Sequence, residues 1–132
     1  MRTTMKYLVD THILIWAVAN TRMLSSSAKS ILSDATSEFF FSAASIWEIA
    51  LKCAKHPDDM PLSAADARRE FIAAGFKELK IDSDAAVAIG ALPSIHGDPF
   101  DRLLIAQSRV NGMKFLSHDH LIAPYDENVV MV

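Results

Sequence analysis

The sequence has few of the residues that mark several common classes of protein. A single cysteine, Cys53, among 132 residues excludes a disulfide framework and a cysteine-rich zinc module. Four glycines and five prolines exclude a collagen-like chain, and a hydrophobic content of 51% excludes disorder. No apolar run approaches the roughly 18 residues that span a membrane, and Asp10 and His12 interrupt the one apolar stretch near the start that resembles a signal peptide. We therefore expect a soluble cytoplasmic protein without membrane contact.

An excess of positive charge is also missing. The chain carries 13 Lys and Arg residues against 16 Asp and Glu residues, which gives a formal net charge of −3. Proteins that bind nucleic acids usually present a basic surface, so this balance taken alone argues against such a function. The conclusion depends on where the acidic residues lie.

What is present is an alternation of strand and helix signals along an uninterrupted chain, for which we expect a single domain over residues 1–132. Short apolar and aromatic runs predict strands at 7–9, 38–42, 78–81, 114–117 and 128–132. Capping residues and helical spacing predict helices at 11–19, 28–35, 45–55, 63–74, 83–91 and 99–110, with Ser45 as a cap or in a first turn. This pattern predicts an α/β fold, a three-layer α/β/α sandwich with a mainly parallel central sheet.

Carboxylates follow the ends of several predicted strands. Asp10 follows the first strand, Glu48 lies early in the helix after the second, and Asp119 follows strand 114–117. Asp98 and Asp101, three residues apart, share one face at the start of a helix. Ligands of parallel sheets bind beyond the carboxyl ends of the strands, so these side chains are expected in one crevice. Like charges gathered there call for a hard divalent cation, Mg²⁺ or Mn²⁺, and the chemistry most often served by such a site is phosphodiester displacement.

Each of these acids also has a purely local interpretation. Asp10 and Asp98 could cap the helices that follow them, and Glu48 could pair with Lys52 one helical turn later. Asp119 could be a turn residue. Their joint occurrence at strand ends is what favours a common site.

Four sequence blocks, in order and spread over nearly the whole chain, resemble those of a PIN domain, most closely of VapC-type toxins. They are YLVDTH at 7–12, SIWEI at 45–49, DPFDRLLIAQ at 98–107 and LSHD at 116–119. The resemblance implies a PIN-like fold and a Mg²⁺- or Mn²⁺-dependent endoribonuclease. It also implies a homodimer that is held inactive by a VapB-type antitoxin.

The resemblance also assigns site residues, block by block. Asp10, Glu48, Asp101 and Asp119 match the acidic quartet of the family, Asp98 matches an additional acid, and Thr11 and Ser45 match small hydroxyl residues beside the site. As a hypothesis, Asp10, Asp101, Asp119 and Asp98 hold the metal, and Glu48 orients or deprotonates the attacking water. Arg102 is the best candidate for a contact to RNA phosphate, with pairing to a carboxylate of the cluster as the alternative.

Two other functions stay open, namely a catalytically inactive PIN-like scaffold that binds nucleic acid or a protein, and a nuclease acting on DNA. A zinc site at His118 and His120 is disfavoured because no third or fourth ligand is evident. The charge balance no longer argues against nucleic acid. Without the five carboxylates of the predicted site, the chain has 11 acidic and 13 basic residues.

Overall fold

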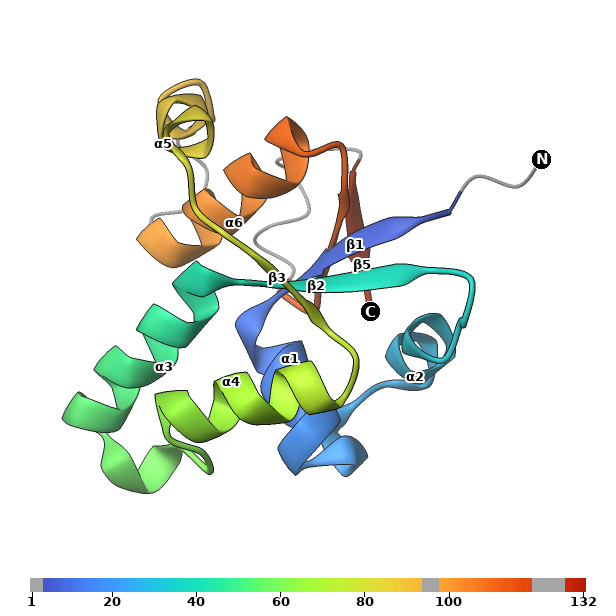
Figure 1. The fold of residues 1–132 in the computed structure, drawn as a ribbon, viewed down its shortest axis with the longest axis vertical. Coiled ribbons are helices and arrows are strands. Elements are labelled where there is room, and N and C mark those ends of the chain that lie inside the picture. Colours follow the sequence, from blue (N-terminus) through green and yellow to red (C-terminus); the bar gives the residue numbers. More distant parts are fainter. Residues whose placement is uncertain (1–3, 94–97, 120–127) are drawn as a thin grey trace.

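The computed structural model describes residues 4–93, 98–119 and 128–132. At its centre is a five-stranded sheet in the order β3-β2-β1-β4-β5, in which every neighbouring pair is parallel (Figure 1). The strands are β1 (Lys6–Val9), β2 (Glu38–Ser42), β3 (Lys77–Leu79), β4 (Lys114–Ser117) and β5 (Val129–Met131). The predicted α/β class with a parallel sheet is confirmed.

Six α-helices and two short 3₁₀ turns are assigned in the described residues. The helices are α1 (Thr11–Ala19), α2 (Ser26–Leu32), α3 (Ala43–Lys55), α4 (Ala64–Ala73), α5 (Ser83–Ile89) and α6 (Pro99–Val110). The 3₁₀ turns η1 (Thr21–Met23) and η2 (Pro57–Asp59) were not predicted. Within the described ranges, no helix is long and apolar enough to cross a membrane.

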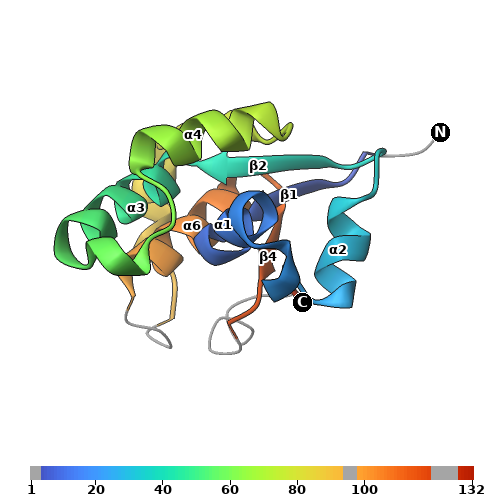
Figure 2. The ribbon, with the colours of Figure 1, turned by 90° about the horizontal axis from the view of Figure 1, so that it is seen from below.

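Alternate residues of each central strand enter separate hydrophobic cores on the two faces of the sheet. Leu8 and Phe115 pack with α5 and α6, whereas Val9 and Leu116 pack with α1, α3 and α4. All four side chains are 0% exposed, and burying one such side chain stabilises a fold by about 1.5–3 kcal/mol. In Figure 1, α5 and α6 lie above the sheet and α1 to α4 lie below it, and Figure 2 shows the latter group from below. The three-layer arrangement follows from this alternation.

Local capping signals explain both the agreements and the differences in helix boundaries. Helix α1 has the predicted bounds because the Asp10 side chain accepts a hydrogen bond from Ile13 N. Helix α3 begins earlier than predicted because Ser42 is its cap and accepts from Ala44 N, so Ser45 lies in the first turn. Helix α2 ends earlier than predicted, and Asp34 beyond it accepts hydrogen bonds from the backbone and side chain of Thr36.

The strand order places a topological switch beside β1. From β1 the chain adds β2 and β3 on one side of the sheet, and then β4 and β5 on the other. The carboxyl ends of β1 and β4 are therefore adjacent, with Val9 paired to Leu116 and Asp10 N donating to Leu116 O at 3.0 Å. A crevice at such a switch point is the usual ligand site of an open α/β sheet.

Candidate active site

A cleft of about 360 Å³ opens at the carboxyl ends of β1 and β4. Its lining comes from four separate parts of the chain and includes all five carboxylates that the sequence places at this edge. The lining residues are Asp10, Thr11, His12, Glu48, Lys52, Asp98, Asp101, His118 and Asp119. We call this the acidic cleft.

Asp10 has both a structural contact and a contact within the cleft. Its Oδ1 accepts a hydrogen bond from Ile13 N at 3.0 Å and thereby caps α1. Its Oδ2 accepts from His118 N at 3.3 Å, and His118 Nδ1 lies 3.4 Å from the same oxygen. Asp10 is only 4% exposed, so these contacts fix the carboxylate at the base of the cleft.

Glu48 is held by a small polar cluster on the other wall. Thr11 Oγ1 donates to Glu48 Oε1 at 2.7 Å and lies 2.8 Å from Ser45 Oγ. Because the threonine hydroxyl has one proton, it can accept from Ser45 while it donates to Glu48. Lys52 Nζ lies 2.9 Å from Glu48 Oε2, which is the predicted pairing one turn along α3. Thr11 and Ser45 thus lie beside the site, where the family resemblance put them.

Asp98 and Asp101 stand at the start of α6. Asp98 caps the helix, with its Oδ1 accepting from Phe100 N at 2.9 Å and from Asp101 N at 3.3 Å, and Pro99 follows in the first turn. Asp101 lies in the first turn, where the helix dipole favours a negative charge. Both side chains are half-buried and line the acidic cleft.

His118 and Asp119 complete the cleft beyond β4. Asp119 N donates to Ser117 Oγ at 3.1 Å, which orders the chain as it leaves the strand. The interaction with the Asp10 carboxylate raises the pKa of His118, against the opposing effect of partial burial. His120, the other imidazole considered for zinc, lies outside the described residues.

Two nitrogen-bearing side chains, those of His12 and Lys52, also line the acidic cleft. Desolvation lowers the pKa of His12, and the nearby Lys52 ammonium lowers it further. Lys52 lies within salt-bridge distance of Glu48, as its i, i+4 spacing suggested. His12 was not predicted as a site residue, and its position two residues after Asp10, in the first turn of α1, is the only hint in the sequence.

Two described hydrogen bonds of Arg102 run to backbone carbonyls outside the acidic cleft. Its guanidinium donates to Pro93 O at 3.0 Å and to Ile89 O at 3.2 Å, so it joins α6 to the end of α5. It is not among the residues that line the acidic cleft. The described contacts therefore give Arg102 a structural role.

The donor set suits a hard divalent cation, because all five carboxylates offer oxygen ligands in one cleft. In their present positions, however, no three His, Cys, Asp or Glu side chains among the described residues are grouped closely enough to hold an ion. Asp98, Asp101 and Asp119 are each half-buried rather than enclosed, whereas Asp10 and Glu48 are buried. The chemistry of the cleft fits a metal, and the final coordination would need the half-buried carboxylates to move.

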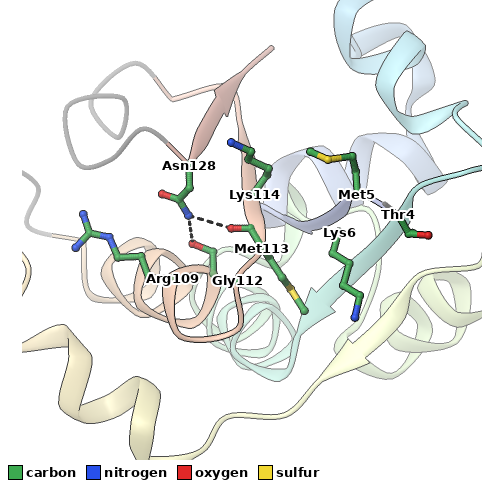
Figure 3. Close-up of a pocket in the computed structure, with 9 residues that line it drawn as sticks. Thr4, Met5, Lys6, Arg109, Gly112, Met113, Lys114 and Asn128 are labelled. Atoms are coloured by element: carbon green, nitrogen blue, oxygen red, sulfur yellow. Dashed lines mark hydrogen bonds between the residues drawn. The ribbon is translucent and has the colours of Figure 1, made fainter. Parts of the chain in front are cut away.

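A second cavity, of about 480 Å³, lies at the amino ends of β1 and β4, opposite the acidic cleft. Among the described residues, its lining includes Lys6, Arg109 and Lys114 but no carboxylate. Figure 3 shows these three side chains pointing in different directions rather than towards a common point. This cavity lacks the converging groups of the acidic cleft.

The fold and the cleft define a class of protein, a parallel α/β domain with an acidic site at the switch point of its sheet. The PIN domain family model matches residues 7–128, and the chain belongs to the PIN domain family. No curated protein matches the sequence.

Several solved structures share the fold at low sequence identity. The chain is similar to VapBC2 from Rickettsia felis bound to a promoter DNA fragment, with a TM-score of 0.67, 10% identity and coverage of 97% and 98% of the two chains. DNA-bound VapBC from Salmonella typhimurium gives a TM-score of 0.68, 16% identity and 98% coverage of both chains. A toxin–antitoxin complex from Klebsiella pneumoniae gives a TM-score of 0.64, 19% identity, and coverage of 95% and 96% of the two chains.

Proposed function

We propose that this protein is a Mg²⁺- or Mn²⁺-dependent endoribonuclease and the toxin of a toxin–antitoxin pair. Members of the PIN domain family are nucleases, and the chain belongs to that family. The observation that carries the proposal is the acidic cleft, which is lined by five carboxylates from four separate chain segments. Such a concentration of like charge is unfavourable unless cations neutralise it.

Asp10, Asp101, Asp119 and Asp98 are the residues that would hold the metal. One or two bound ions would supply an activated water and neutralise charge on the phosphate oxygens. Asp10 is fixed by its contacts to Ile13 N and His118 N. The other three are half-buried and would turn towards it.

Glu48 is proposed to orient the attacking water or to accept its proton. The carboxylate is suited to this role because Thr11 and Lys52 hold one oxygen each, at 2.7 Å and 2.9 Å. In-line attack by the water oxygen on phosphorus would break the bond to the 3′ oxygen. The products would be a 5′-phosphate and a 3′-hydroxyl.

A protein partner and a second copy of the chain belong to the same proposal. The similar solved structures include toxin–antitoxin complexes, which supports a VapB-type antitoxin encoded with this chain, both acting in the cytoplasm.

Trp47 is 57% exposed and packs edge-on against Phe100, with ring centroids 4.9 Å apart. We assign this apolar surface to the homodimer, so Trp47→Ser should shift the mass measured by light scattering to that of a monomer.

The deciding experiment is RNA cleavage by purified protein with Mn²⁺ or Mg²⁺. The wild type should cut RNA, and Asp10→Asn should lose cleavage while it keeps its fold, because asparagine also caps helices. Asp84→Asn is the matched control, since it removes one charge from the exposed first turn of α5 and should cut normally.

The alternatives give different results in the same assay. A wild-type protein that binds RNA but never cuts it would be an inactive scaffold. Preferential cleavage of single-stranded DNA would identify a DNA nuclease. Asp10→Asn protein that cuts as fast as the wild type would refute the assigned site.

A further inference from the structure

A second hollow adjoins the acidic cleft on the side of α1. It has a volume of about 630 Å³ and lies between α1 and the η2 segment that follows α3. We call it the aromatic groove, lined in part by His12, Ile15, Trp16, Lys52, His56 and Met60. His12 and Lys52 line both this groove and the acidic cleft, so the two hollows meet at these side chains.

The wall of the groove on α1 is built from aromatic rings held in place. Trp16 is half-buried and packs against the core on that face of the sheet. The His118 ring meets it edge-on, with centroids 4.7 Å apart at 62°, and the His12 ring lies 5.9 Å away at 47°. The indole is therefore a fixed apolar surface at the border of the acidic cleft.

A cationic side chain stands where the two hollows meet. Lys52 has a side chain that is 41% exposed, and its Nζ lies 2.9 Å from Glu48 Oε2. Fixed aromatic rings beside a lysine are the combination that binds single-stranded nucleic acid, because the bases stack on the rings and the cation meets a phosphate. The groove volume also falls within the roughly 300–1,000 Å³ that is usual for sites of small organic groups.

We propose that the aromatic groove binds the base of the nucleotide next to the scissile phosphate of single-stranded RNA. The base stacks against Trp16, with the His12 ring beside it, while Lys52 contacts the adjoining phosphate. This inference rests on the proposed ribonuclease function and adds a selection rule to it. Only a base that has left its own helical stack can enter the groove, so unpaired segments are cut in preference to duplexes.

The lining favours a base over an antitoxin helix. Six of the eleven lining residues are polar or charged, namely His12, Asn20, Lys52, His56, Asp58 and Asp59. A groove that binds an amphipathic helix needs a row of apolar contacts along its length. The exposed carboxylates of Asp58 and Asp59 at the far rim can instead accept hydrogen bonds from base amino groups.

The chain allows a direct spectroscopic test because it has only two tryptophans, Trp16 and Trp47. A Trp47→Phe variant reports on Trp16 alone, and a Trp16→Phe variant is the matched reporter for Trp47. Both carry Asp10→Asn to prevent cleavage. The probes are a random-sequence RNA decamer and a ten-unit abasic ribose-phosphate with the same backbone charge, each titrated in the presence of Mn²⁺.

We expect the decamer to quench Trp16 fluorescence and the abasic chain to leave it unchanged, with little effect on Trp47. Trp16→Leu should weaken decamer binding by about 5- to 100-fold and leave binding of the abasic chain unaltered. His12→Ala, which changes an exposed side chain, should weaken decamer binding about threefold or more and provides the test if Trp16→Leu fails to fold.

Equal affinity for the two probes, or wild-type affinity in both Trp16→Leu and His12→Ala, would overturn the base-binding groove. The proposed function would survive that result if the wild type still cut RNA. If the decamer bound and quenched Trp16 but the wild type cut no RNA, the proposed function would fail and the groove would stand. Trp16→Leu protein that keeps its RNA affinity but no longer binds the co-encoded antitoxin would make the groove a protein-binding site and refute the proposal.

Discussion

Replacing Thr11 with valine tests the arrangement around Glu48 most directly. The Thr11 hydroxyl lies 2.7 Å from Glu48 Oε1 and 2.8 Å from Ser45 Oγ. All three residues are buried, with exposures of 3%, 5% and 0% respectively. Valine has the shape of threonine and a similar helix propensity, so Thr11→Val removes the hydroxyl and changes little else.

The expected loss can be worked out from these contacts. A hydrogen bond to a charged group contributes about 1.5–3 kcal/mol, and a buried group left without its partner incurs a desolvation penalty of similar size. Glu48 would keep only the Lys52 contact on its other oxygen. We expect the free energy of unfolding to fall by about 2–3 kcal/mol. With an m-value of about 1–3 kcal/mol/M, the urea midpoint should fall by roughly 0.7–3 M.

The assay is equilibrium urea unfolding followed by far-ultraviolet circular dichroism, with Thr11→Ser as the control that keeps the hydroxyl. In a Glu48→Gln background, the cost of Thr11→Val should shrink to about 1 kcal/mol, because the hydrogen bond is then to a neutral amide. RNA cleavage by Thr11→Val should also fall about tenfold, since Glu48 loses one of its two fixed contacts. A midpoint within about 0.2 M of the wild type would refute the reasoning, because the shift expected from the hydroxyl is several times larger.

Three further predictions use other parts of the site. Mn²⁺ at about 100 times its dissociation constant should stabilise the wild type by about 2.7 kcal/mol in thermal unfolding and leave the stability of Asp10→Asn unchanged. Equal shifts in the melting temperatures of the two proteins would contradict metal binding at Asp10. In metal-free protein the Asp10 carboxylate raises the pKa of His118, so folding favours the protonated imidazole. The stability advantage of the wild type over His118→Gln should therefore be complete below the ordinary pKa of 6.5 and disappear as the pH rises through the raised pKa. Melting temperatures of the two proteins across this pH range test the prediction. A difference in melting temperature that does not vary with pH would contradict it. Arg102→Gln removes the donors to Ile89 O and Pro93 O, so the free energy of unfolding measured in urea should fall by about 1–3 kcal/mol. RNA cleavage by the folded variant should be unchanged. Loss of cleavage at wild-type stability would instead make Arg102 a substrate contact.

The gathering of the acids was predictable because it depends on chain order and strand direction. Asp10 and Asp119 follow two parallel strands, and the switch in strand order between β1 and β4 brings them to one crevice. The bounds of α1 were predictable because Asp10 caps that helix through its own side chain. These features depend on local sequence and on one general rule of sheet topology.

Other features depend on contacts between distant parts of the chain and had no local signal. The His118 ring packs on Trp16, about a hundred residues earlier, and so helps to hold the indole that lines the aromatic groove. The predicted strand 78–81 is displaced to 77–79, where Lys77 pairs in register with Phe40 of β2. Arg102 was expected at the substrate because it adjoins Asp101, whereas the described contacts of its guanidinium run to the end of α5.

The local and the functional interpretations of the acids turn out to be compatible. Asp10 and Asp98 do cap helices, and Glu48 does pair with Lys52, yet all three line the acidic cleft. Each carboxylate has at least one donor from its own neighbourhood, which offsets part of the repulsion among them when no cation is bound. Each carboxylate oxygen has two lone pairs, so it can accept from a local donor and still offer a lone pair to a cation. For Asp10, the contact that starts α1 thus also holds a carboxylate of the proposed metal site in position.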